Sequence, residues 1–154
     1  MPAQGDLAPD VTLQMGDGSD TRLSQLRLPL VLYFYPKDDT SGCTVEAKDF
    51  SALMPIFEKE GTSVLGVSKN GPKDHAKFTK KYDLTVPLAT DADGSVCEAF
   101  GTWVEKSLYG RKYMGIERAT FLIDTDGRIA KVWRKVSVKG HAEDVLAAAR
   151  ALKG

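Results

Sequence analysis

Short unbroken apolar runs alternate along this chain with longer stretches in which apolar residues recur every three or four positions. An unbroken run is typical of a strand covered on both faces, and the longer spacing is typical of a helix with one buried side. The runs predict strands over residues 30–35, 63–68 and 88–90. The helical spacing predicts helices over residues 72–82 and 96–100, and a last helix with one apolar stripe formed by Ala142, Val145, Leu146, Ala149 and Leu152.

A further helix is expected to begin near Cys43, because four apolar residues then follow at helical spacing: Ala47, Phe50, Leu53 and Phe57. Pro55 lies inside this helix, and an interior proline removes a hydrogen bond and clashes with the preceding turn. We therefore expect a kink or a restart near Pro55. Gly61 is expected to end the helix.

Two hairpins are also expected. Residues 11–15 alternate apolar and polar side chains before a glycine-containing turn and residues 21–23, and residues 119–123 and 128–133 flank an aspartate-glycine turn. The stretch after residue 100 indicates a glycine-containing connection. The chain thus reads as an α/β protein in which a mixed sheet lies between helices, with an N-terminal hairpin, and no repeat or linker divides residues 1–154 into more than one domain.

Composition excludes several classes of function. The 154 residues include 21 basic and 21 acidic side chains, so the formal net charge is zero and no electrostatic signature for nucleic acid or an acidic membrane is present. No apolar run approaches the roughly 18 residues that suggest a membrane span, and no basic-then-apolar leader opens the sequence. We expect a cytoplasmic protein, in agreement with its two cysteines, which fit a reducing compartment better than a disulfide scaffold.

The candidate chemistry lies between the first buried strand and the helix that follows it. Cys43 falls near a helix N-terminus, where free N–H groups and the helix dipole stabilise a thiolate. A thioredoxin-type dithiol enzyme would carry a second cysteine three residues earlier, but this position is Thr40. Dithiol exchange within the motif is therefore excluded, whereas a threonine hydroxyl could hydrogen-bond both the sulfur and an incoming oxygen substrate.

The string Pro36-x-x-x-Thr40-x-x-Cys43 resembles the active-site motif of the peroxiredoxins. The wider match, over residues 33–46, 109–116 and 118–124 and the opening at residues 5–9, is similar to the PrxQ or bacterioferritin-comigratory branch of that family. The resemblance implies a thioredoxin-like fold, a monomer, and a thiol peroxidase that reduces hydrogen peroxide and organic hydroperoxides without a metal or organic cofactor.

The resemblance also implies roles for single residues. Arg118 would reach Cys43, where its guanidinium would stabilise the thiolate and hold a peroxide oxygen. Pro36 would shield the thiolate from water, and backbone N–H groups at Gly42 and Cys43 would help to bind the peroxide. Taken alone, Pro36 would equally be a strand terminator, Thr40 a helix cap and Arg118 a solvated charge at a strand end.

Cys97 is a candidate resolving cysteine. Relatives in the family carry a resolving cysteine at positions that are Lys48 or, in the next helix, Phe78 or Thr79 in this chain. The sequence leaves open whether Cys97 can approach Cys43, since a disulfide requires Cα atoms within about 7 Å. An external thiol, either thioredoxin or a small thiol, is therefore expected to reduce the sulfenic acid of Cys43.

The remaining chemistry-bearing residues carry weaker signals. His75 and His141 are expected on exposed helix surfaces, and with the two cysteines they show no paired spacing for a metal. Arg111 and Lys112 are expected to be surface charges. Glu46 would disfavour a thiolate nearby, so its expected role is structural.

Two other functions remain open at this stage. Oxidation of Cys43 could unfold the first helical turn and expose apolar surface in a redox-regulated binding protein or holdase. Alternatively, Cys43 and Cys97 could act together in a thiol–disulfide oxidoreductase, although no paired motif supports this.

Overall fold

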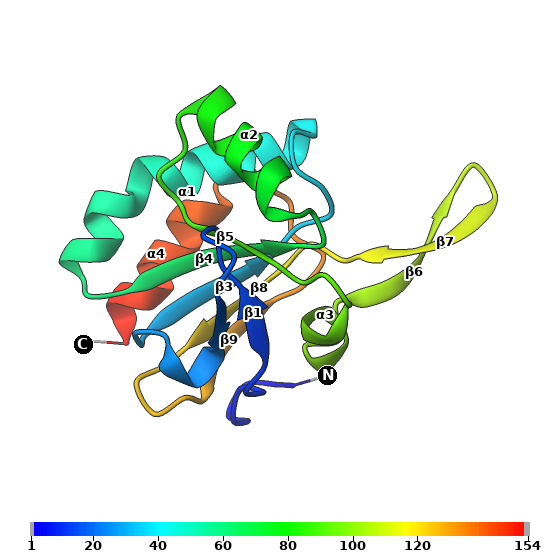
Figure 1. Ribbon diagram of the computed structural model, residues 1–154. Coiled ribbons are helices and arrows are strands. Elements are labelled where there is room, and N and C mark those ends of the chain that lie inside the picture. Colours follow the sequence, from blue (N-terminus) through cyan, green and yellow to red (C-terminus); the bar gives the residue numbers. More distant parts are fainter. Residues whose placement is uncertain (1, 153–154) are drawn as a thin grey trace.

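The computed structural model describes residues 2–152. Its helices and strands alternate along the chain (Figure 1). The strands are β1 Thr12–Gln14, β2 Asp20–Arg22, β3 Leu30–Phe34, β4 Ser63–Ser68, β5 Leu88–Thr90, β6 Trp103–Leu108, β7 Arg111–Ile116, β8 Ala119–Ile123 and β9 Ile129–Trp133. The helices are α1 Ser41–Lys59, α2 Pro72–Tyr82, α3 Ser95–Ala99 and α4 His141–Ala151, with a 3₁₀ turn, η1, at Leu23–Gln25.

A seven-stranded mixed sheet in the order β2-β1-β5-β4-β3-β8-β9 forms the centre of the fold. Strands β3, β4 and β5 are parallel, whereas β8 pairs antiparallel with β3 and β9 antiparallel with β8. The parallel strands are joined through helices, as parallel pairing requires. The expected mixed sheet, its N-terminal hairpin and its flanking helices are confirmed.

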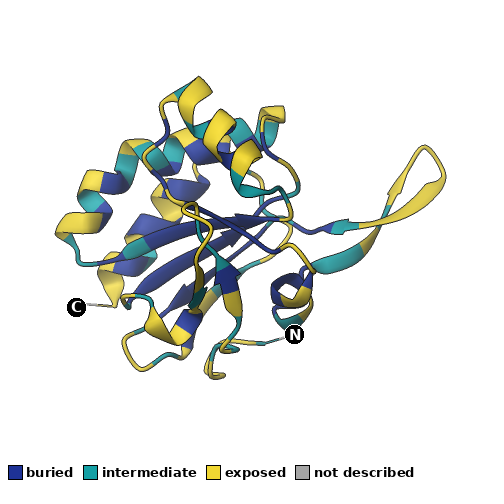
Figure 2. Ribbon diagram, viewed as in Figure 1, coloured by how far each residue is buried: buried dark blue, intermediate teal, exposed yellow. Residues whose placement is uncertain are grey.

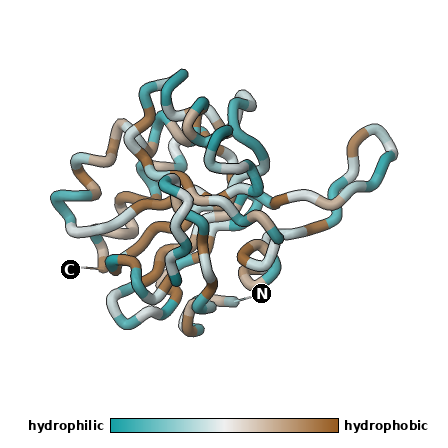
Figure 3. The backbone as a smooth tube through the Cα atoms, in the orientation of Figure 1, coloured by the Kyte–Doolittle hydropathy of each residue, from teal (hydrophilic) through white to brown (hydrophobic). Residues whose placement is uncertain are grey.

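The sheet separates two apolar clusters. Along β3, Val31 and Tyr33 belong to one cluster and Leu32 and Phe34 to the other, because successive side chains of a strand point to opposite faces. Helices α1, α2 and α4 cover the first face, and α3 with η1 covers the second. Buried residues follow the strands and the inner sides of the helices (Figure 2), where apolar residues also concentrate (Figure 3). Within residues 2–152, no helix is both long and apolar enough to cross a membrane.

Of the kink or restart expected near Pro55, the restart does not occur, because α1 is continuous from Ser41 to Lys59. Proline has no N–H to donate to the carbonyl of Ser51, four residues earlier. The hydroxyl of Thr85 donates to that carbonyl over 3.1 Å instead. A neighbouring segment therefore satisfies the backbone group that Pro55 leaves without a partner.

The expectation of a glycine-containing connection after residue 100 is wrong. The chain there forms β6 and β7, a regular antiparallel pair that is separate from the main sheet. Figure 1 shows this hairpin projecting from the body of the molecule. The hairpin carries four exposed large side chains, Leu108, Tyr109, Tyr113 and Met114.

Candidate active site

Cys43 lies in the first turn of α1, directly after the loop of residues 36–40 that follows β3. Its side chain is buried, with 2% of its surface exposed, in the apolar cluster that α1, α2 and α4 cover. Because Cys43 stands within the first helical turn, the N–H groups around it have no partner within the helix. They remain available to a thiolate or to a bound oxygen.

Arg118 contacts both Cys43 and Glu46. Its Nη2 lies 3.3 Å from Cys43 Sγ, and its Nη1 lies 2.7 Å from Glu46 Oε1. The Arg118 side chain is only 16% exposed and that of Glu46 1%, so this ion pair is shielded from solvent. Burial alone lowers the pKa of the guanidinium, but Glu46 and Cys43 outweigh it, and the pKa of Arg118 rises. Arg118 therefore stays charged and is held by two of its nitrogens, unlike a solvated charge at a strand end.

Glu46 is the most constrained acid of the site. Burial raises its pKa to about 7, although the neighbouring Arg118 acts in the opposite direction. Its Oε2 and the hydroxyl of Tyr33 are both buried without a hydrogen-bond partner among the described residues. Glu46 was expected to have a structural role, and its contact with Arg118 has the geometry of such a role.

Gly42 allows the close approach of Arg118. A Cβ atom at this position would lie 3.1 Å from Arg118 Nη2, closer than an ordinary contact. The backbone of Gly42 itself is helical, so no special conformation requires glycine here. The absent side chain leaves room for the guanidinium beside the sulfur.

Thr40 occupies the N-cap position of α1, but its side chain does not cap the helix, contrary to the expectation for a threonine there. Its hydroxyl instead donates to the carbonyl of Lys37 over 2.9 Å. The proton is thus committed to a backbone carbonyl, and the hydroxyl oxygen keeps its lone pairs for a donor such as a peroxide O–H. Pro36, half-buried, lies two residues beyond the end of β3, at the start of this loop.

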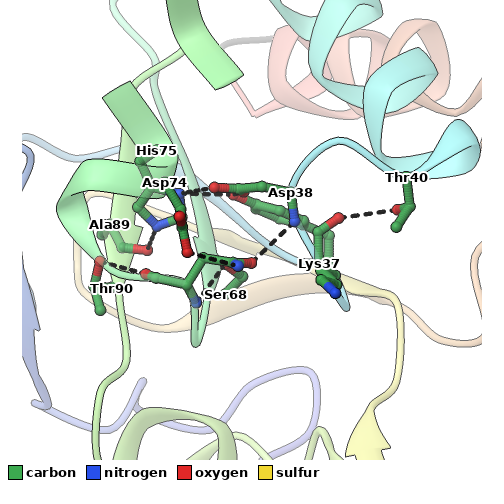
Figure 4. A network of polar contacts seen from close by, with 10 residues as sticks. Lys37, Asp38, Thr40, Ser68, Asp74, His75, Ala89 and Thr90 are labelled. Atoms are coloured by element: carbon green, nitrogen blue, oxygen red, sulfur yellow. Dashed lines mark hydrogen bonds and ion pairs between the residues drawn. The ribbon is translucent and has the colours of Figure 1, made fainter. Parts of the chain in front are cut away.

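A buried polar network holds the other side of the loop (Figure 4). The Asp38 carboxylate accepts a hydrogen bond from Tyr35 over 2.5 Å and lies 2.6 Å from His75 Nδ1. His75 Nε2 lies 3.0 Å from the carbonyl of Ala89. The expectation that His75 is exposed on its helix is wrong. His75 is 3% exposed, because it lies on the buried face of α2. Sequence reasoning also missed Asp38, because the pairing of a histidine with an acid 37 positions away leaves no local signal.

His141 is buried as well, which corrects its expected place on a helix surface. It begins α4, and its Nε2 lies 2.8 Å from the hydroxyl of Thr120 in β8. The rings of Phe50 and Trp133 meet its ring edge-on. Burial lowers the pKa of His141 to about 4, so the ring is neutral near pH 7 and packs as part of the core.

Cys97 and Cys43 are not brought together. Cys43 belongs to the cluster on the side of α1, and Cys97, in α3, belongs to the cluster on the opposite face of the sheet. Both are free thiols. Burial, with a contribution from Asp91, raises the pKa of the Cys97 thiol to about 12, so this thiol is not a ready nucleophile.

Lys106 on β6 is a further charged neighbour that sequence reasoning missed. Burial lowers its pKa, and the charge of Arg118 lowers it further. The hairpin of β6 and β7 ends at Ile116, two residues before Arg118, so its base adjoins the site. Arg111 and Lys112 are exposed, which confirms their expected place on the surface.

In the described part of the chain, no three histidine, cysteine or acidic side chains gather in a way that could hold a metal ion.

Comparison with known proteins places this geometry in a family. Residues 4–132 match the AhpC/TSA family. The peroxiredoxin Bcp of Xanthomonas campestris is 46% identical over 143 residues, which cover 92% of this chain and 89% of that protein. The peroxiredoxin Bcp of Bacillus subtilis is 44% identical over 92% of this chain and 91% of its own length.

Solved structures of such relatives share the fold. PrxQ of Xylella fastidiosa superposes with a TM-score of 0.93 at 40% identity, covering 100% of this chain and 99% of the other. The bacterioferritin comigratory protein of X. campestris, described for its alkyl peroxide reduction activity, superposes with a TM-score of 0.90 at 43% identity over 99% of both chains. These matches confirm the thioredoxin-like fold. The chain therefore belongs to the AhpC/TSA family of peroxiredoxins, within its Bcp or PrxQ branch, and is a thiol-dependent peroxidase.

Proposed function

We propose that this protein reduces hydrogen peroxide and alkyl hydroperoxides with Cys43 as the attacking thiolate. The observation that carries the proposal is the contact of Arg118 Nη2 with Cys43 Sγ at 3.3 Å, while Nη1 is held by Glu46. A fixed cation at the sulfur stabilises the thiolate and can bind a peroxide oxygen. The alkyl peroxide reduction activity described for the X. campestris relative supports the same substrate class.

The proposed reaction breaks the O–O bond of the peroxide. The Cys43 thiolate attacks the nearer oxygen, a new S–O bond forms, and the electron pair of the O–O bond leaves with the farther oxygen, which is released as water or an alcohol after taking up a proton. Arg118 and the N–H groups around Gly42 and Cys43 would stabilise the charge on the oxygens. The Thr40 hydroxyl donates its proton to the Lys37 carbonyl. Its oxygen would accept a hydrogen bond from the O–H of the peroxide and so orient the peroxide. Pro36 would limit the access of water.

An external thiol is proposed to complete the cycle. The sulfenic acid of Cys43 condenses with that thiol and releases water, and a second thiol then reduces the mixed disulfide. Cys97 is a poor candidate for the first step, since its sulfur belongs to the cluster on the other face of the sheet. We propose thioredoxin or a small thiol as the reductant.

The remaining proposals concern the whole chain. We infer one domain over residues 1–154, because strands from both ends of the sequence share one sheet. Two free thiols fit a reducing compartment such as the cytoplasm. A monomer is proposed from the resemblance to the PrxQ branch.

The test is peroxide consumption with thioredoxin and its reductase, or with a small dithiol, for the native chain, Cys43→Ser and Cys97→Ser. We expect Cys43→Ser to abolish consumption and Cys97→Ser to retain multiple turnovers. If Cys97→Ser instead consumes a single equivalent and stops, Cys97 is the resolving cysteine. Turnover with the small dithiol alone would exclude thioredoxin as the required reductant, and no consumption by the native chain would favour the binding-protein function.

A further inference from the structure

The loop of residues 36–40 carries Thr40 to the site, and every side chain of the loop after Pro36 is polar. On its outer side, Lys37, Asp38 and Asp39 line a cavity of about 410 Å³ that is also lined by α2 residues such as Lys77 and Phe78. Apolar contacts therefore cannot fix the loop on this side. Its position depends on polar contacts that cross from the loop to α2 and to the strand ends beneath it.

Asp38 makes most of those contacts. Its two carboxylate oxygens meet Tyr35 and His75, and its backbone N–H donates to Asn70 Oδ1 over 2.9 Å. Three segments, namely the residue directly after β3, α2 and the turn after β4, thus converge on one loop residue. With 7% of its surface exposed, Asp38 is buried enough for these hydrogen bonds to be strong.

The partners of Asp38 are themselves fixed. His75 Nε2 faces the carbonyl of Ala89 in β5, so the ring is held from both of its nitrogens. Both nitrogens thus face oxygen atoms of the protein. The Asp38 and His75 side chains are each only 4% exposed, so the loss of either one leaves a buried polar group of the other without its partner. Asn70 is held in the same way by Ser68 and by Thr90, whose hydroxyl donates to its carbonyl over 2.7 Å.

The network ends next to the proposed substrate contact. Lys37, immediately before Asp38, provides the carbonyl that accepts the Thr40 hydroxyl. A shift of Asp38 would move this carbonyl and turn the hydroxyl away from its orientation. Figure 4 shows the sequence of contacts from Ala89 through His75 and Asp38 to Lys37 and Thr40.

We propose that Asp38 and His75 are positioning residues for peroxide reduction, which set the orientation of the Thr40 hydroxyl from outside the site. This inference rests on the role proposed for Thr40. Helix α2 supplies none of the groups that would touch the peroxide. Through His75, it would nevertheless control how well the peroxide is aligned. It also separates two properties of Cys43: its reaction with peroxide needs Thr40, whereas its alkylation needs only an accessible thiolate.

The experiment compares these two reactions in Asp38→Asn and His75→Gln. Asparagine cannot accept hydrogen bonds with both of its terminal atoms, so it loses Tyr35 or His75 as a partner. We expect the rate constant for hydrogen peroxide to fall by about tenfold or more, as for displaced positioning groups, while alkylation by iodoacetamide changes by less than about twofold. Asp39→Asn is the matched control, because exposed Asp39 also contacts α2, through Lys81 and Tyr82, and surface pairs of this kind contribute little.

A double-mutant cycle tests the route through Thr40. In a Thr40→Val background, Asp38→Asn is expected to reduce the peroxide rate by no more than about twofold, because the group it positions is already gone. A full additive loss in that background, or a parallel loss of alkylation and peroxide reaction, would overturn the inference. If Thr40→Val alone leaves the peroxide rate unchanged, the proposed role of Thr40 fails and the inference with it. If Thr40→Val is impaired and Asp38→Asn and His75→Gln are not, only the inference fails. Should Asp38→Asn not fold, His75→Gln gives the same comparison and the same cycle.

Discussion

At the scale of single residues, Glu46 carries the clearest link between structure and pH. Burial raises its pKa from 4.5 to about 7. Between these values the folded protein keeps a proton on Glu46 that the unfolded chain has lost, so the free energy of unfolding falls as the pH rises through this window. Below it, both states hold the proton and Glu46 contributes no pH dependence.

Glu46→Gln is therefore expected to flatten the pH dependence of the unfolding free energy between pH 4.5 and about 7. The native chain should lose on the order of 3 kcal/mol more than the variant across this range, since each unit of pKa corresponds to about 1.4 kcal/mol. Urea unfolding at a series of pH values measures this. Glu58→Gln, exposed on the same helix, is the matched control. Equal slopes for the native chain and Glu46→Gln would show that another group causes the dependence.

Gly42 gives a prediction that separates stability from activity. In Gly42→Ala, a Cβ atom 3.1 Å from Arg118 Nη2 pushes the guanidinium away from Cys43. The helical backbone accepts alanine, so we expect the unfolding free energy to stay unchanged or to rise by about 0.5 kcal/mol. The reaction with peroxide should slow by about tenfold, the scale of a displaced positioning group.

Stopped-flow peroxide kinetics and urea unfolding together test Gly42→Ala. Gly16→Ala serves as the control, because a Cβ atom there meets nothing within 4 Å. An unchanged peroxide rate in Gly42→Ala would mean that Arg118 can move without loss of function.

At the scale of elements, α1 depends on a residue outside it. The Ser51 carbonyl, deprived of a helical partner by Pro55, accepts the Thr85 hydroxyl. Thr85→Val should therefore lower the unfolding free energy by about 1 kcal/mol. In a Pro55→Ala background the new N–H at position 55 serves that carbonyl, so the same substitution should cost clearly less. Urea unfolding of the four chains measures the difference, and equal costs in both backgrounds would contradict the account.

The elements also explain how far sequence reasoning could reach. Unbroken apolar runs such as residues 30–35 identified the central strands, because a strand buried on both faces leaves a local pattern. The pair β6 and β7 was missed, since its exposed strands carry mixed polar and apolar residues. His75 was misplaced for a related reason: its partner Asp38 is distant in sequence, and only tertiary packing reveals the pair. Arg118, 75 positions from Cys43, was found through the family resemblance rather than through any local pattern.

At the scale of the whole molecule, the two buried cysteines lie in different apolar clusters, which the sheet separates. Cys43 lies at the start of a helix beside a cation, whereas Cys97 is 0% exposed inside the second cluster, where β3, β8 and α3 meet. Burial raises the pKa of Cys97 to about 12, so its thiolate is scarce near neutral pH in the folded protein. Strands from both ends of the sheet contribute to this cluster, and opening it therefore requires most of the fold to open.

Cys97 should consequently report global unfolding. In a Cys43→Ser chain, which leaves one thiol, we expect iodoacetamide to label Cys97 only through unfolded molecules. The logarithm of the labelling rate should then rise linearly with urea, with the slope found for equilibrium unfolding. The double variant Cys43→Ser with Cys97→Ser, which has no thiol, provides the unlabelled control. A labelling rate that does not depend on urea would mean that α3 opens alone, in which case the second cluster is not a single cooperative unit and oxidants could reach Cys97 in the native protein.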